Sequence, residues 1–245
     1  YLLSPEEIQQ KSAGELNGLL QEKFSFDNFR WQQENRVRIG EAFRADCLNR
    51  VLYKCPRCHM EGEMRGEGSV IRCGSCGKAY ELTEYGFLEA LEGETEFPHI
   101  PDWYRWERES VRRELEQGSY LLDVAVDICV MVDTKSVYRV GKGRLRHTAA
   151  GFHLTGCDGK LDYVQKPGAS YSLYADYYWY EVGDVICIGN GDLLYYCFPT
   201  EGGDVVAKTR LATEELYKMG RRDGGRRAAG RRASDKMLDR AAGIG

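Results

Sequence analysis

Four cysteines fall into two pairs, each with the spacing C-x-x-C, in the stretch KCPRCHMEGEMRGEGSVIRCGSCGK. Cys55 and Cys58 form the first pair and Cys73 and Cys76 the second, with fourteen residues between the pairs. Each C-x-x-C makes a tight turn that directs two thiolates at one metal ion, and a hairpin in GEMRGEGSVIRC can bring the two turns together. The spacing therefore predicts a four-thiolate zinc site on Cys55, Cys58, Cys73 and Cys76.

The first pair also has a second interpretation. Cys55, Cys58 and His59 spell C-x-x-C-H, the attachment pattern of a c-type haem. A haem leaves Cys73 and Cys76 without a role, whereas zinc uses all four thiols. Iron binding and thiol redox chemistry are further alternatives for the same cluster. We expect zinc, with His59 as a neighbour of the metal and not a ligand, since Cys58 already completes the first turn.

The energetics of so small a segment also favour a metal. Residues 51–92 contain few large apolar side chains, and ordering about forty residues costs on the order of 60 kcal/mol in conformational entropy. A structural zinc ion contributes roughly 10–16 kcal/mol of apparent binding free energy to folding. The metal is therefore expected to decide whether this segment folds.

The other five cysteines stand alone, mostly inside apolar runs such as DICVMV and DVICIG. Single cysteines in such runs are usually small buried hydrophobic residues, with catalytic or redox roles as the minor alternative. An odd, unpatterned set of nine cysteines is typical of a reducing compartment, which argues against an exported haem protein. The five residues are Cys47, Cys129, Cys157, Cys187 and Cys197.

The net charge of −4 is unevenly distributed along the chain. Residues 218–245 contain nine Lys or Arg and three Asp, a net charge of +6, so residues 1–217 carry −10. Within residues 51–92, five Lys or Arg stand against seven Glu, and a four-thiolate zinc centre adds further negative charge. Because nucleic-acid phosphates attract positive charge, this composition argues against a nucleic-acid partner. It favours a structural ribbon or a protein-interaction module.

The elements that must position the cysteines begin with a helical connector, residues 1–50. Ser4 and Ser12 each stand three residues before a Glu, which is the capping-box spacing at a helix N-terminus. A further helix is predicted to start near Asp27 and to stop before Gly40.

Residues 51–92 are predicted to form a small zinc ribbon, because the short β-like pieces VLYKC, GEMR, SVIRC and KAYELTEYG are separated by glycine-rich turns. Residues 93–118 are predicted to form a linking helix that starts near Pro101 and is capped by Gly118.

Residues 119–217 change to a period of two, which predicts an antiparallel β barrel or sandwich. The strand series runs from SVYRVGKGRLRHTAAGFHLTGCDGKLDYVQ through SYSLYADYYWYEV, DVICIG and DLLYYCFP to DVVAKTRL, and ATEELYKM is predicted to be a short closing helix. Several strands closed by one helix are an element order similar to pleckstrin-homology-like domains. The predicted fold class is therefore α+β.

Residues 218–245 are rich in Gly, Ala and Arg, and we expect a disordered basic tail. Such a tail can lie on an anionic membrane surface, where each Lys or Arg contributes about 1 kcal/mol. No run of eighteen apolar residues and no signal peptide stands in the sequence, so we expect a cytoplasmic protein whose tail can attach it to the inner face of the membrane. The arginines form three doublets, Arg221, Arg222, Arg226, Arg227, Arg231 and Arg232.

Most of the chain resembles one enzyme family. The run KCPRCHMEGEMRGEGSVIRCGSCGKAYELTEYGFLEALEGETEFPHIPDWYRWERESVRREL resembles the region that follows the catalytic domain in bacterial lysophosphatidate (1-acyl-glycerol-3-phosphate) acyltransferases, and GETEFPHIPDWY is its most specific part. The segments FSFDNFRWQQENRVRIGEAFRADCLNRVLYKC, SLYADY, GDVICIGNGDLLYYCFP and ATEELYK resemble the same group. The resemblance reaches up to Lys218.

This resemblance implies transfer of an acyl chain from a carrier thioester to lysophosphatidic acid by a His-x4-Asp pair. We expect that pair in an acyltransferase domain before Tyr1, which would be the partner of this chain. The chain itself would be the non-catalytic C-terminal region of a phospholipid-synthesis enzyme, with a zinc ribbon and a β domain for docking, regulation or lipid recognition. The alternative is a free-standing zinc-ribbon adaptor that binds protein or RNA.

Other candidate catalytic residues have simpler interpretations. His153 and Asp158 match His-x4-Asp, but a strand and a hairpin turn are predicted there, without the fixed shared face that general-base catalysis needs. His99, between two prolines, is expected to pack or cap, and His147, beside two arginines, to lie on a solvated face. The tyrosines of SLYADYYWYEV are expected in the core or in cross-strand pairs, with a ligand-binding wall as the alternative.

Overall fold

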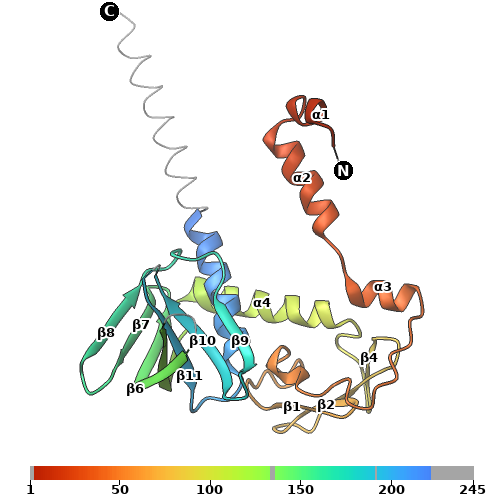
Figure 1. Ribbon diagram of the computed structural model, residues 1–245. Helices are drawn as coiled ribbons and strands as arrows, with labels where there is room; N and C mark the ends of the chain where they lie inside the picture. Colours follow the sequence, from red (N-terminus) through yellow and green to blue (C-terminus); the bar gives the residue numbers. More distant parts are fainter. Residues whose placement is uncertain (1–2, 133–135, 191, 222–245) are drawn as a thin grey trace, which may run out of the picture.

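The computed structural model describes residues 3–132, 136–190 and 192–221. The protein is α+β, as predicted, with a four-stranded and a seven-stranded antiparallel sheet. Figure 1 shows the two sheets side by side, with helix α4 (Ile100–Gln117) extending from one to the other. We call the four-stranded part the ribbon, and the seven-stranded sheet with the helix that follows it the β unit.

Two helices at the start of the chain have the predicted N-terminal caps but no core. In α1 (Pro5–Gln9) and α2 (Ala13–Phe24), Ser4 and Ser12 each close a capping box. Neither helix contains a buried residue, and both project away from the two sheets (Figure 1). Their caps, and not tertiary packing, define where they begin.

Helix α3 (Asn28–Glu34) starts where predicted, since Asp27 is its N-cap, but it ends several residues before Gly40. The buried amide of Gln32 explains the early end: it donates to the carbonyls of Val37 and Glu84, both at 3.2 Å, and draws the chain onto the ribbon. The connector is therefore helical only in part, and residues 35–50 are irregular apart from a short 3₁₀ turn at Leu48–Arg50.

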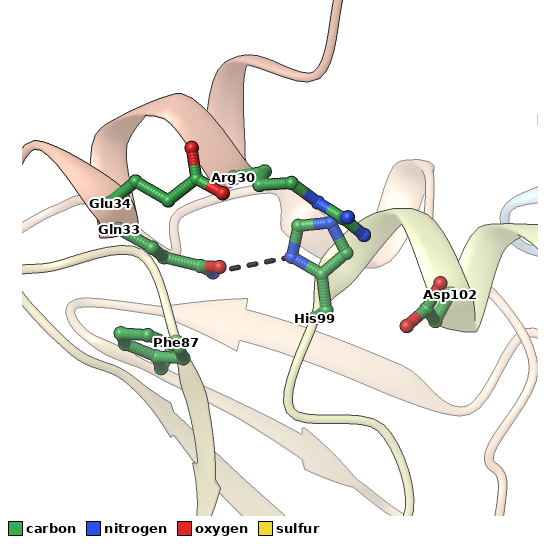
Figure 2. Close-up of a pocket in the computed structure, with 6 residues that line it drawn as sticks. All are labelled: Arg30, Gln33, Glu34, Phe87, His99 and Asp102. Atoms are coloured by element: carbon green, nitrogen blue, oxygen red, sulfur yellow. Dashed lines mark hydrogen bonds between the residues drawn. The ribbon is translucent and has the colours of Figure 1, made fainter.

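A histidine clasp joins α3 to α4 (Figure 2). His99, the N-cap residue of α4, hydrogen-bonds through Nε2 to Asp27 Oδ2 at 2.7 Å. The Gln33 amide donates to Gly86 O at 2.8 Å and to His99 Nδ1 at 3.2 Å. Because the amide uses its hydrogens on these two acceptors, Nδ1 accepts and Nε2 donates. His99 thus has the packing role expected of it.

The ribbon sheet has the strand order β1-β2-β3-β4, with each strand antiparallel to the next. Its outer edge at β1 is covered by the chain before it, since Ala45 N and Cys47 N donate to Gly68 O and Gly66 O. A side chain at Gly66 would collide with Ala45, so glycine is required there. The strands are β1 (Met64–Glu67), β2 (Val70–Cys73), β3 (Ala79–Leu82) and β4 (Leu88–Ala90).

Helix α4 completes the ribbon core and then continues to the β unit. It begins next to Pro101 and ends at Gly118, which adopts the left-handed conformation (φ 70°) predicted for a helix cap. Trp103, near its start, is fully buried against Tyr80 of the ribbon, with 5.1 Å between ring centroids. Val111 and Leu115, near its end, pack on the helix that closes the chain. One helix therefore takes part in two cores.

The β unit has the strand order β8-β7-β6-β5-β11-β10-β9. Two meanders, β5 to β8 and β9 to β11, are joined because the first strand pairs with the last, with Ile128 opposite Cys197. The sheet is open, and β8 and β9 are its edges. The strands are β5 (Leu122–Val132), β6 (Ser136–Thr148), β7 (Gly151–Gly156), β8 (Leu161–Gln165), β9 (Tyr174–Trp179), β10 (Gly183–Gly189) and β11 (Leu194–Pro199).

The closing helix is longer than the sequence predicted. Residues 205–221 are helical, so the segment DVVAKTRL, predicted as a strand, is the first half of this helix, and residues 218–221 belong to it and not to a tail. Val206, Thr209, Thr213 and Leu216 are all buried, at intervals of three and four residues. That helical period outweighs the β-branched residues that suggested a strand.

Candidate metal centre

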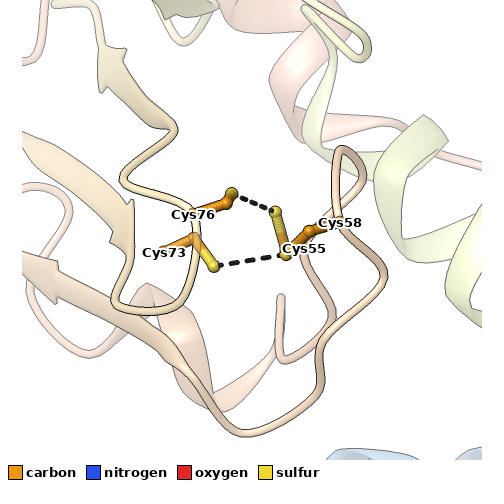
Figure 3. Close-up of side chains that lie close together, drawn as sticks. All are labelled: Cys55, Cys58, Cys73 and Cys76. Atoms are coloured by element: carbon orange, nitrogen blue, oxygen red, sulfur yellow. Dashed lines mark hydrogen bonds between the residues drawn. The ribbon is translucent and has the colours of Figure 1, made fainter.

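The four cysteines of the two C-x-x-C pairs converge at one end of the ribbon (Figure 3). Their sulfur atoms all lie within 4.8 Å of one another. Cys55 Sγ is 3.7 Å from Cys76 Sγ, and Cys58 Sγ is 3.7 Å from Cys73 Sγ. The sequence thus identified all four members, and the ribbon fold brings together residues that are up to 21 positions apart.

These sulfurs fit a tetrahedral metal ion. A metal–sulfur distance of about 2.3 Å requires sulfur atoms about 3.8 Å apart in a regular tetrahedron. The two measured separations of 3.7 Å match that value, and four soft thiolates without oxygen ligands suit zinc or iron more than magnesium or calcium. The cluster can therefore hold one metal ion with all four positions filled by protein.

Each C-x-x-C turn is closed by an equivalent backbone hydrogen bond. His59 N donates to Cys55 O and Gly77 N donates to Cys73 O, both at 2.9 Å. The two donors also share a left-handed backbone, with φ of 63° at His59 and 74° at Gly77. His59 therefore occupies the position that glycine holds in the second turn, and its ring lies against Trp106 at 5.6 Å between centroids. It is a neighbour of the cluster and not a member, as predicted.

The environment treats the four thiols unequally. Burial raises the pKa of Cys55 and that of Cys73 above the ordinary thiol value, although backbone N–H groups of the two turns oppose the change. At the exposed Cys76, burial is the largest single effect and raises the pKa, but the Lys78 N–H and hydrogen bonds with neighbouring cysteine thiols together outweigh it, so the pKa of Cys76 is lowered. A metal ion that binds all four must displace protons from the two buried thiols.

The five single cysteines lie outside this cluster. Cys129, Cys187 and Cys197 are buried, as expected, and burial raises the pKa of Cys187 to about 12. Cys157 is half-buried against the core of the β unit. The expectation was wrong for Cys47, which is exposed and has a left-handed backbone before the 3₁₀ turn.

The His-x4-Asp match does not form a pair. His153 Nε2 contacts Asp162 Oδ1 at 2.8 Å on the neighbouring strand, and both side chains are largely exposed. Asp158 lies in the turn after β7 with φ of 55°. Two exposed groups on a sheet surface lack the enclosed position beside a substrate that general-base catalysis needs.

His147 is buried, contrary to the expected solvated face. It is 1% exposed, stacks on Phe152 with 3.7 Å between centroids, and its Nδ1 lies 3.0 Å from the Tyr120 hydroxyl. Burial lowers the pKa of His147 to about 3. The alternation along β6 places every second residue inward, so Arg144 and Arg146 do lie outward while the histidine does not.

The tyrosine-rich segment divides between two faces. Tyr177 packs against the apolar core of the β unit, and Trp179 is buried in a separate cluster of the same sheet. Tyr174, Tyr178 and Tyr180 are more than half exposed. Of the arginines predicted to bind an anionic surface, Arg221 is exposed at the end of the described helix. Arg222, Arg226, Arg227, Arg231 and Arg232 lie outside the described residues.

A cluster of charged residues, which the sequence did not predict, lies where the ribbon meets the β unit. Lys54, Glu61, Glu114 and Lys208 come from three separate elements and form ion pairs with one another. Glu107 lies beside them, fully buried, and burial raises its pKa well above the ordinary carboxyl value. No local pattern links residues so far apart, and their partnership depends on the tertiary fold.

Comparison of the chain with protein-family models, with curated proteins and with solved structures gave no match in any of the three searches. Among the described residues, no helix combines the length and the apolar content needed to cross a bilayer.

Proposed function

We propose that the chain is a non-catalytic module in which a structural zinc ion, held by the ribbon cysteines, fixes a platform for the β unit. The observation that supports it most strongly is the convergence of four sulfurs within 4.8 Å of one another, a number of protein ligands that fills a tetrahedral site. Closed four-thiolate sites are typical of structural zinc, whereas catalytic zinc keeps one position for water or substrate. Zinc is preferred to iron because the ribbon spacing of the two pairs is that of zinc modules.

The surroundings of the histidines support a structural role. His99 is locked between Asp27 and Gln33, His147 is buried against an aromatic ring, and His59 lies on Trp106. Acid–base or nucleophilic catalysis uses a histidine whose free ring nitrogen lies beside a nucleophile. Among the described residues, none of these three histidines has that arrangement.

We further propose that this module serves a bacterial lysophosphatidate acyltransferase as its accessory region, for docking, regulation or lipid recognition. This part rests on the resemblance of the ribbon and GETEFPHIPDWY segments to that family. The reading frame that encodes Tyr1 tests it: an upstream domain with His-x4-Asp is expected. A frame that instead starts at this chain would favour a free-standing adaptor.

Metal analysis tests the zinc proposal directly. The purified, reduced chain should contain about one zinc per molecule, and cobalt substitution should give the intense thiolate-to-metal absorption of a tetrahedral four-sulfur site. Replacing Cys47, the exposed cysteine outside the cluster, with serine is the matched control and should leave both unchanged. A reduced chain that binds no zinc would overturn the proposal.

A further inference from the structure

The first C-x-x-C turn belongs to a small hairpin, residues 53–62, which contributes to the metal centre at its tip and contacts two helices at its base. Gly62 N donates to Tyr53 O and Cys55 N donates to Met60 O, both at 2.9 Å, and Lys54 pairs with Glu61 as an isolated β-bridge. The tip of this hairpin carries Cys55 and Cys58. Its base, one residue before the first ligand, lies against α4 and the closing helix. Whatever fixes the tip also fixes the base.

The base of the hairpin is built into the interior. Lys54 N donates to the buried Glu107 carboxylate at 2.9 Å, and the Trp103 indole donates to Lys54 O at 3.0 Å. The Tyr53 side chain is 1% exposed and packs in one core with Leu115 of α4 and Leu211 of the closing helix. The hairpin is thus hydrogen-bonded to α4, which continues from the ribbon to the β unit, and it packs on the closing helix of the β unit.

Four charges close this junction as a ring, which we call the charge ring. Lys54 Nζ lies 3.2 Å from Glu61, Glu61 lies 2.7 Å from Lys208 Nζ, Lys208 lies 2.7 Å from Glu114, and Glu114 lies 3.8 Å from Lys54. The signs alternate, and every side chain is at least two-thirds buried. Removing one partner of such a pair leaves another charge poorly solvated, so partly buried rings respond sharply to displacement.

The second C-x-x-C turn has no such outward contacts. Gly74 N donates to Glu63 O, and the Lys78 ammonium donates to the carbonyls of Glu92 and Glu94. These partners all belong to the ribbon and the loop after it. Within the described residues, the first turn thus provides the direct path from the metal centre to the charge ring. The ribbon also meets the β unit through the chain before the hairpin, where Asn49 donates to Asp204 at 2.7 Å and Arg50 pairs with Asp184 at 3.4 Å.

We propose that metal loading controls how firmly the β unit is held, through hairpin 53–62 and the charge ring. This proposal rests on the zinc site proposed above. With metal bound, Cys55 and Cys58 fix the hairpin, and the hairpin presents Lys54 and Glu61 to Glu114 and Lys208. Without metal, the hairpin loses two of its anchors and the ring loses its geometry, so the closing helix is released from the ribbon.

Hydrogen exchange on the full chain, with zinc and after chelation, measures this coupling. In the wild type, zinc removal should lower the protection of amides 205–216 about ten-fold, within the usual range of allosteric coupling. The variant Glu61→Gln/Lys208→Met removes one charge of each sign from the ring and should reduce that response to about two-fold or less. Because linkage is reciprocal, the zinc affinity of this double variant should fall, relative to the wild type, by the factor by which its exchange response is reduced.

The matched control is Asp127→Asn/Arg139→Met, which removes an ion pair of 2.5 Å on the seven-stranded sheet whose arginine is more than half exposed, and it should keep the wild-type response. The single variant Glu61→Gln gives a milder change if the double variant does not fold. If zinc binds and its removal speeds exchange in residues 64–82 but not in 205–216, the coupling is wrong while the zinc site stands. If no zinc binds, the proposed function fails, and the coupling fails with it.

Discussion

The ribbon and the β unit are both antiparallel sheets, but different forces hold them. The β unit buries a continuous apolar cluster between its strands and the closing helix, with Ile128, Leu145 and Leu154 fully enclosed. The ribbon strands are only three or four residues long, and two of the four cysteines, Cys55 and Cys73, are members of its core. Short strands cannot bury enough apolar surface alone, so the ribbon core also contains cysteine side chains and residues of α4.

The comparison also corrects the expected energetics. The sequence of residues 51–92 contains few large apolar residues and predicts that the segment needs metal to fold. The ribbon core, however, also includes Ile100 and Trp103 from α4, outside that segment. Together with Tyr80, they give the ribbon a core with two fully buried aromatic rings. The metal therefore adds to a real core and does not replace one.

The largest expected effect separates the two sheets by their metal dependence. Replacing Cys73 and Cys76 with serine should abolish zinc binding and remove most of a contribution on the order of 10 kcal/mol. The ribbon amides 64–82 should then exchange rapidly, which hydrogen exchange and metal analysis measure. Cys73 and Cys76 belong to the second turn, whose hydrogen bonds stay within the ribbon and the loop after it. Retention of one zinc per chain, with unchanged ribbon protection, would contradict the assignment of these ligands.

A middle effect compares equivalent core deletions in the two sheets. Trp103→Ala removes a fully buried ring and its hydrogen bond to Lys54 O, and it should cost about 3–5 kcal/mol of unfolding free energy. Leu154→Ala in the β unit should cost about 2–5 kcal/mol. Chemical denaturation with and without zinc separates them: zinc affinity should fall in the first variant and stay unchanged in the second. Equal zinc affinity in both would show that the Trp103 core does not support the metal site.

The smallest effect is confined to the β unit and depends on pH. The pKa of His147 is about 3 in the folded chain, well below its ordinary value of 6.5. Between these values the unfolded chain binds a proton that the folded chain does not, so stability falls as pH falls, by about 1.4 kcal/mol per unit. From pH 6.5 to 5 this amounts to about 1.6 kcal/mol, because the unfolded imidazole is only half protonated at pH 6.5.

His147→Gln, which keeps an acceptor for the Tyr120 hydroxyl, should remove that part of the pH slope in denaturation curves. His153→Gln, on the exposed surface, is the matched control and should keep it. If the slopes of the two variants coincide, His147 is not the group responsible.

Local signals were sufficient for much of the fold. The C-x-x-C spacing identified the four clustered sulfurs, the serine caps began α1 and α2, and Gly118 marked the end of α4. These features depend on a few neighbouring residues and the hydrogen bonds they can form, which the sequence states directly.

The features that sequence did not reveal depend on distant partners. Residues 205–210 carry β-branched side chains, and only burial against α4 and the sheet selects the helix. His147 directly follows Arg146, and the register of β6 decides which way it points. The charge ring joins Lys54 to Lys208 across more than 150 positions. Such choices are made by tertiary packing, which no window of the sequence contains.

The pairing of β5 with β11 also sets the order in which the chain can fold during synthesis. Every ribbon strand pairs with its neighbour in sequence, so the ribbon and α4 can form as soon as residue 117 leaves the ribosome. The β unit must wait, because Ile128 pairs with Cys197, and closing so long a loop costs entropy before any contact repays it. A nascent chain therefore carries a finished ribbon beside a first meander in which one edge of β5 is paired with β6 and the other still waits for β11.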